Sequence, residues 1–180
     1  MRNMKWLLVV VALGLAVSAA PGAALITKGS QEIEVSGQLD FATEVGTEFD
    51  LGLNYAYFFW DRIALGARGG VGDNDAVTYG GIGLTAEYNF ILPPKFRPLF
   101  GTDLVPFLGA AVDYRYAKLF DENESAIVLG GEAGVKFFLT DSTAIHLSLV
   151  GEWASEEIYA DDLEATDLNL YAALGMRFYF

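Results

Sequence analysis

The chain has 180 residues, of which 24 are acidic, 11 are basic and 53% are hydrophobic. This acidity argues against nucleic-acid binding, because phosphate contacts need patches of lysine and arginine. There are no cysteines, so the sequence excludes disulfides, zinc–thiolate sites and cysteine nucleophiles.

The first predicted element is a secretory signal peptide at residues 1–24. It has a basic start at Arg2 and Lys5, a short apolar core and then small residues. An uncleaved membrane anchor is the alternative, which the short apolar run disfavours. We therefore expect residues 25–180 to form one mature domain.

Eight segments that alternate between apolar and other residues follow in chain order. A period of two is that of a β-strand, and about ten residues can cross a bilayer at a tilt. The sequence therefore predicts an all-β fold, an eight-stranded antiparallel up-and-down transmembrane β-barrel. Its strands are expected at residues 32–42, 49–57, 62–71, 78–90, 106–116, 127–137, 144–153 and 167–180.

One face of these strands carries nearly all the charges. A soluble barrel, such as a lipocalin, would turn this face to water, whereas a membrane barrel turns it inward. Alternation alone does not decide between these two kinds of barrel. An eight-stranded barrel has room inside only for side chains, where charges need partners. The membrane interpretation predicts an ion-pair network in the lumen, formed by Glu34, Asp50, Arg62, Arg68, Glu87, Asp113, Arg115, Glu132, Lys136, Glu152 and Arg177.

The connections favour the membrane interpretation. With a periplasmic N-terminus, the long acidic connections at residues 118–125 and 155–167 are extracellular loops. The connections at residues 58–62 and 138–143 are short, as periplasmic turns should be. Aromatic residues near these turns predict an aromatic girdle at the membrane interface. The connection at residues 91–103, with three prolines, is longer than a turn requires.

The sequence resembles the small eight-stranded outer-membrane β-barrels of the OmpA-transmembrane, OmpX and OmpW kind. Three stretches carry the resemblance: "VPFLGAAVDY", "GEAGVKFFLTD" and "ALGMRFYF". The resemblance covers the mature chain and implies the outer membrane of a Gram-negative bacterium. It also implies that the barrel-assembly machinery binds the last strand, which in this family ends in phenylalanine. The matching residues here are Ala172, Leu174, Met176, Phe178 and Phe180.

The expected function is structural or one of surface interaction, with adhesion through the acidic loops as one form of it. We expect a monomer in contact with outer-membrane lipids and lipopolysaccharide, without enzymatic activity, metal or cofactor. A narrow channel for ions or small solutes is the alternative.

A lipid A-modifying hydrolase is a further alternative. His146 and Ser148 resemble the His-x-Ser element of lipid A deacylases, and such a pair can activate a hydroxyl group. Strand parity, however, turns both residues to the lumen, and Leu149 replaces the asparagine usual after that element.

Overall fold

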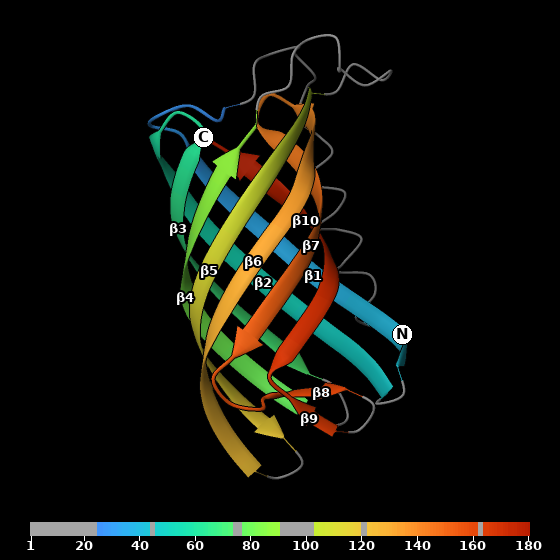
Figure 1. The fold of residues 1–180 in the computed structure, drawn as a ribbon. Helices are drawn as coiled ribbons and strands as arrows, with labels where there is room; N and C mark the ends of the chain where they lie inside the picture. The colour runs from blue at the N-terminus through green and yellow to red at the C-terminus, as the bar shows by residue number, and fades with distance from the viewer. Residues whose placement is uncertain (1–24, 44–45, 74–76, 91–102, 120–121, 162–163) are drawn as a thin grey trace.

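The computed structural model describes residues 25–43, 46–73, 77–90, 103–119, 122–161 and 164–180. Eight strands close into an antiparallel barrel in the order β1-β10-β7-β6-β5-β4-β3-β2 (Figure 1). They are β1 (Gln31–Thr43), β2 (Gly46–Trp60), β3 (Ile63–Asp73), β4 (Val77–Asn89), β5 (Asp103–Leu119), β6 (Glu122–Thr140), β7 (Thr143–Ala154) and β10 (Leu168–Tyr179). The predicted eight-stranded barrel is confirmed. The predicted signal peptide lies outside the described residues.

The two ends of the barrel differ in their connections. One end, called the turn end here, carries the two-residue turns at Asp61–Arg62 and Asp141–Ser142, which were predicted as short. The other end, the loop end, carries a small hairpin of β8 (Tyr159–Asp161) and β9 (Glu164–Thr166). This hairpin was not predicted, since a three-residue strand is too short for alternation to reveal. The proline-rich residues 91–102 lie outside the described part of the chain.

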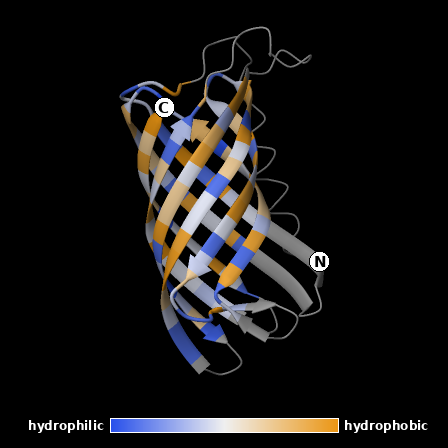
Figure 2. Cartoon of the chain, in the orientation of Figure 1, coloured by the Kyte–Doolittle hydropathy of each residue, from blue (hydrophilic) through white to orange (hydrophobic). Residues whose placement is uncertain are grey.

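Hydrophobic and hydrophilic residues alternate along the strands (Figure 2), and their exposed fractions show that the outer wall is apolar and the inside charged. Leu84 and Leu170 are 69% and 79% exposed, whereas Lys136 and Arg177 are 0% and 1% exposed. An apolar surface of this extent is unfavourable in water and matches lipid, so the soluble-barrel alternative is not supported. In the described ranges, no helix has the length and hydropathy needed to cross a membrane.

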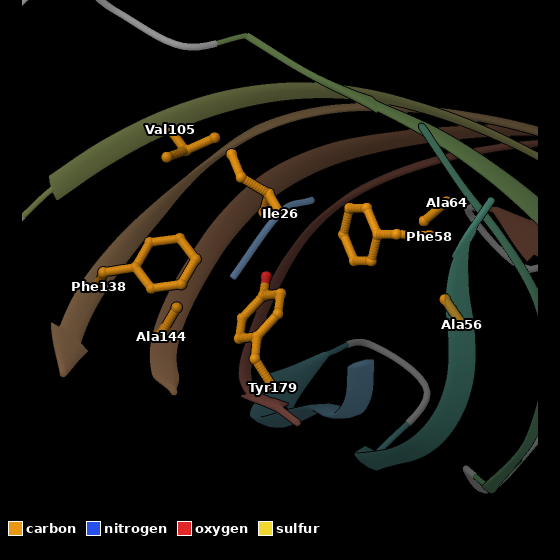
Figure 3. Packing of buried hydrophobic residues seen from close by; sticks show 8 residues of the cluster. All are labelled: Ile26, Ala56, Phe58, Ala64, Val105, Phe138, Ala144 and Tyr179. Atoms are coloured by element: carbon orange, nitrogen blue, oxygen red, sulfur yellow. The ribbon is translucent and has the colours of Figure 1, made fainter. Parts of the chain in front are cut away.

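An apolar floor closes the lumen at the turn end. Phe58, Phe138 and Tyr179 are buried inside the barrel and surround Ile26, which belongs to the segment that precedes β1 (Figure 3). The backbone amide of Arg62 donates to the carbonyl oxygen of Ile26 over 3.0 Å and so anchors this segment. The floor is therefore built partly from chain that is not in any strand.

The predicted aromatic girdle is only partly correct. Phe59, Trp60 and Phe180 are exposed on the outer wall, but Phe58 and Phe138 point inward. Each of these two lies an even number of residues from a lumen-facing position on its strand, so parity directs it to the floor.

Lumen-facing glycines make room for the charged side chains. A Cβ atom at Gly83 on β4 would lie 1.9 Å from Oδ1 of Asp113 and 2.5 Å from the carbonyl oxygen of Val112. Gly131 on β6 lies instead on the outer face, and a Cβ atom there would meet nothing within 4 Å. Alanine substitutions at the two positions therefore separate a steric clash in the lumen from the general effect of replacing a glycine in a strand.

We expect Gly83→Ala to lower the free energy of unfolding by about 1–3 kcal/mol, because the added methyl group overpacks the lumen. Gly131→Ala should leave it unchanged or raise it by about 0.4–1 kcal/mol, through the smaller entropy of the unfolded chain. Urea unfolding in lipid vesicles, followed by tryptophan fluorescence, measures both. Equal effects at the two positions would contradict the steric account.

Candidate functional site

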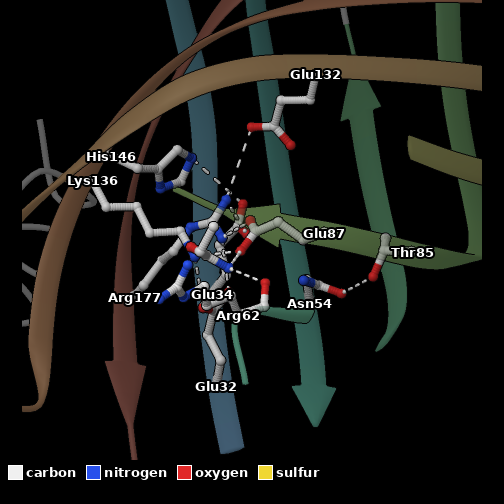
Figure 4. A network of polar contacts seen from close by, with 11 residues as sticks. Glu32, Glu34, Asn54, Arg62, Thr85, Glu87, Glu132, Lys136, His146 and Arg177 are labelled. Carbon is white, nitrogen blue, oxygen red and sulfur yellow. Dashed lines mark hydrogen bonds and ion pairs between the residues drawn. The ribbon is translucent and has the colours of Figure 1, made fainter. Parts of the chain in front are cut away.

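The first charged layer of the lumen lies just above the floor and is called the turn-end layer. Arg177 Nη1 is 2.8 Å from Glu32 Oε1 and also bonds Glu87, and its Nη2 is 3.1 Å from Glu34 Oε2 (Figure 4). Lys136 Nζ lies 3.0 Å from Glu32 Oε2 and 2.5 Å from Glu87 Oε1. Five side chains near the barrel axis thus connect strands β1, β4, β6 and β10.

Aromatic contacts support the two cations of this layer. The Arg177 guanidinium carbon is 4.5 Å from the centre of the Phe107 ring, and Lys136 Nζ is 5.2 Å from it. Such contacts stabilise a desolvated cation through the quadrupole of the ring. With 0–1% exposure, both cations depend on these rings and on the carboxylates rather than on water.

A second charged layer lies toward the loop end and is called the loop-end layer. Arg68 forms a two-point ion pair with Asp113, with Nε 2.8 Å from Oδ1. Arg115 forms another with Glu152, with two nitrogen–oxygen distances of 2.9 Å. Arg68 Nη2 is 3.4 Å from Glu152 Oε1 and so links the two pairs. Paired geometry of this kind is the strongest that a guanidinium makes with a carboxylate.

Tyrosine hydroxyls complete the loop-end layer. The Tyr159 hydroxyl, from the β8–β9 hairpin, donates to Glu152 over 2.9 Å and accepts from Arg115 over 2.9 Å. Tyr79 donates to Asp50, and Tyr171 lies 3.4 Å from Glu152. Burial raises the pKa of Tyr159 above its ordinary value, so this hydroxyl stays a donor. The hairpin is thereby fastened to the barrel wall.

A cavity of about 130 Å³ separates the two layers. Its walls include Ser36, Asn54, Thr85 and Glu132, and Thr85 Oγ1 lies 3.1 Å from Asn54 Oδ1. The described lumen holds seven carboxylates against four cations. Glu132 has its nearest cation, Arg177, at 3.9 Å. The cavity is therefore polar, with an excess of negative charge around it.

The structure brings ten of the eleven residues of the predicted network into the lumen, in two layers. The prediction for Arg62 is wrong: this residue lies in the β2–β3 turn with φ 70°, and its side chain is exposed. The predicted strand began one residue too early, because alternation does not reveal where a turn ends.

Sequence reasoning missed four other participants. Glu32 lies at the centre of the turn-end layer, and its place on the charged face of β1 was the signal that could have found it. The hydroxyls of Tyr79, Tyr159 and Tyr171 were missed because only charged residues were counted as members of the network. The predicted assembly residues of β10 all share its outer face, where Leu174 and Phe180 are 58% and 65% exposed.

The His146–Ser148 pair lies inside the barrel. The two residues are 0% and 3% exposed, and among the described residues neither the ring nitrogens of His146 nor the Ser148 hydroxyl has a hydrogen-bond partner. His146 Nε2 is 3.5 Å from Glu34 Oε1. The described side chains also contain no group of three or more histidine or carboxylate residues placed to hold a metal ion.

Arg177→Met should lower the free energy of unfolding by about 3–5 kcal/mol, because it leaves Glu32 and Glu87 buried with one cation fewer. Adding Glu32→Gln to this variant should restore part of the loss. Arg62→Met is the matched control and should change stability by less than about 0.5 kcal/mol, since its side chain is exposed. Urea titration in lipid vesicles tests all three variants, and equal losses in the two arginine variants would refute the buried role of Arg177.

No protein-family model matches the sequence, and no curated protein matches it significantly. Solved structures do resemble the fold. Neisserial surface protein A (NspA) is 16% identical with a TM-score of 0.56, over 84% of this chain and 96% of that one. A de novo designed transmembrane β-barrel is 15% identical with a TM-score of 0.53, over 86% and 98%.

OprG, an outer-membrane protein from Pseudomonas aeruginosa, is 15% identical with a TM-score of 0.49, over 86% of this chain and 97% of that one. At such identities the likeness concerns the fold, and the first two structures carry it. The closed strand order, the apolar outer wall and this likeness agree with one another. The chain therefore has the eight-stranded transmembrane β-barrel fold of small outer-membrane proteins.

Proposed function

We propose that this protein is a closed barrel of the outer membrane with a structural or surface-interaction role, and that its lumen is a plug. The closed lumen carries the proposal: the floor and the two charged layers lie one behind another along the barrel axis. Strands from around the barrel supply these layers, so the plug also braces the wall. This use of polar interior side chains accounts for the network without a transported solute.

The alternative of a narrow channel has less support. A conducting path would have to pass the Arg177–Glu32–Lys136 contacts, where all three side chains are 0–1% exposed, and then the apolar floor. An ion would need to replace its hydration shell with groups that already bind one another. The cavity between the layers offers space, but the turn-end layer separates it from the floor.

The enzymatic alternative is also weakly supported. A lipid hydrolase needs its nucleophile at the lipid-facing surface, whereas His146 and Ser148 are buried in the lumen. In addition, a histidine that activates serine accepts the proton of its hydroxyl, and the described contacts do not include that hydrogen bond.

The loop end has the features of a surface that binds other molecules. Glu156 and Glu157 are exposed beside Ile158, which is 2% exposed and packs on Ala126 and Val128. The buried Ile158 and the bonded Tyr159 hold this segment over the barrel mouth, so the acidic side chains stand on an ordered base. A cationic partner is the chemistry that such a surface favours.

Two partners of the barrel itself also belong to this proposal. The outer wall is suited to outer-membrane lipids and lipopolysaccharide. The outer face of β10, with Ala172, Leu174, Met176, Phe178 and Phe180, is suited to recognition by the barrel-assembly machinery.

The plug is tested by planar-bilayer conductance. We expect the wild-type barrel and Arg68→Ala to be silent, because the turn-end layer and the floor remain in both. Arg68→Ala combined with Lys136→Ala, Phe58→Ala and Phe138→Ala removes part of both charged layers and of the floor and should conduct. Heat-modifiable migration on a gel checks that every variant is folded, and steady conductance by the wild type would overturn the proposal.

The surface role is tested by cell adhesion to plates coated with extracellular matrix. Glu156→Gln combined with Glu157→Gln should reduce adhesion of cells that carry the barrel, because the exposed charges disappear while Ile158 and Tyr159 stay. Asp141→Asn, at the turn end, is the control and should adhere like the wild type. If adhesion survives the first variant unchanged, these two side chains are not the contact surface.

A further inference from the structure

The barrel seam, where β1 meets β10, is paired along only part of its length. The two strands pair from Glu32–Tyr179 to Gly37–Leu174, which is six residue pairs, whereas each of the other seven strand pairs of the barrel has eleven or more. Both strands nevertheless continue toward the loop end. β1 stays paired with β2 as far as Thr43, and β10 with β7 as far as Leu168.

Among the residues that the structure describes, neither residues 38–43 of β1 nor residues 168–173 of β10 have a strand partner on the seam side, so the open part of the seam has two free edges. Figure 1 shows β1 running away from β10 here, together with β2. A register shift between Asp40 and Thr43 in the β1–β2 pairing accompanies this course. Gly37 is the last β1 residue paired with β10, and a Cβ atom there would lie 2.9 Å from the carbonyl oxygen of Asp50.

Both strands of the seam also border the lumen. Ser36 on β1 and Tyr171 on β10 line the cavity between the two charged layers. The open part of the seam therefore lies beside this cavity.

A free strand edge is costly in a membrane. Lipid offers no hydrogen bonds to the backbone N–H and C=O groups, so strands that cross a bilayer pair on both sides. Outside the membrane, such an edge is a template for another chain. The open seam therefore needs a partner that supplies backbone hydrogen bonds to two edges at once.

The directions of the two edges restrict that partner. β1 and β10 are antiparallel, so one strand inserted between them would run parallel to one of the two. A second copy of this chain avoids this problem, because it offers a β1 edge and a β10 edge of its own. We propose that two copies pair through their open seams, with β1 of each copy antiparallel to β10 of the other.

The sequence of the two edges fits this pairing. If the register set by Gly37–Leu174 continues between copies, Leu39 lies opposite Ala172, Phe41 opposite Leu170 and Asp40 opposite Tyr171. By residue type, the first two pairs combine apolar residues, and the third combines an aspartate with a tyrosine. The interface is self-complementary, as a two-fold dimer requires. Each copy keeps its own floor, so this dimer replaces the expected monomer without opening the plug.

The absence of cysteines makes the pairing directly testable. Leu39→Cys and Ala172→Cys are placed on separate, differently tagged copies, co-expressed, and treated in membranes with a short thiol cross-linker. We expect a cross-linked dimer that carries both tags on a non-reducing gel. Val35→Cys and Met176→Cys form the matched control, because these residues pair within one copy and should give no mixed dimer.

Both pairs are also made as double variants in a single copy. The control double variant should cross-link internally, which shows that the reagent spans an antiparallel pair. A Leu39→Cys/Ala172→Cys double variant that links only within its own copy would mean that the seam closes on itself and would overturn the proposal. Absence of the mixed dimer would overturn it as well, and so would equal cross-linking by Ala172→Cys alone, which indicates pairing between two β10 edges.

Discussion

The whole barrel depends on keeping the Arg177 and Lys136 cations within bonding distance of Glu32 and Glu87. Arg177, Lys136 and Glu32 are 0–1% exposed and Glu87 is 12% exposed, so each ion is stabilised mainly by the others and by the Phe107 ring. Removing one ion from such a set lowers the stability of the fold by more than the whole set contributes to it. The arrangement therefore fixes the relative heights of β1, β4, β6 and β10, and with them the register of the closed sheet.

Much of the fold could be predicted from alternation, because one face of each strand meets lipid and the other meets charge. Parity placed Lys136, Arg177 and Glu152 on one face, and the membrane interpretation of the connections turned that face inward. Partners could not be predicted, because they depend on the stagger between strands far apart in the chain. Glu32 was missed although its place on the charged face of β1 indicated the lumen, and Arg62 was misplaced because the pattern does not show where a strand begins.

The two ends of the lumen differ in how their charged side chains are stabilised. At the turn end, aromatic rings and Ile26 exclude water, and the adjacent ions are dry. At the loop end, tyrosine hydroxyls extend the ion pairs, and the β8–β9 hairpin covers the mouth while leaving Glu156 and Glu157 exposed. A dry turn end and a polar, accessible loop end suit a barrel that presents a binding surface. The open part of the seam lies at the same loop end.

Ile26 gives the floor a mechanical property. Its side chain sits among Phe58, Phe138 and Tyr179, yet it belongs to a short segment outside the sheet, held by backbone bonds at Gly29 and Arg62. Because no strand ladder holds this segment, it can leave the floor before any strand pair of the barrel separates. The seal of the floor therefore depends on the anchoring of one short segment, whereas the stability of the wall depends on the ladder of strands.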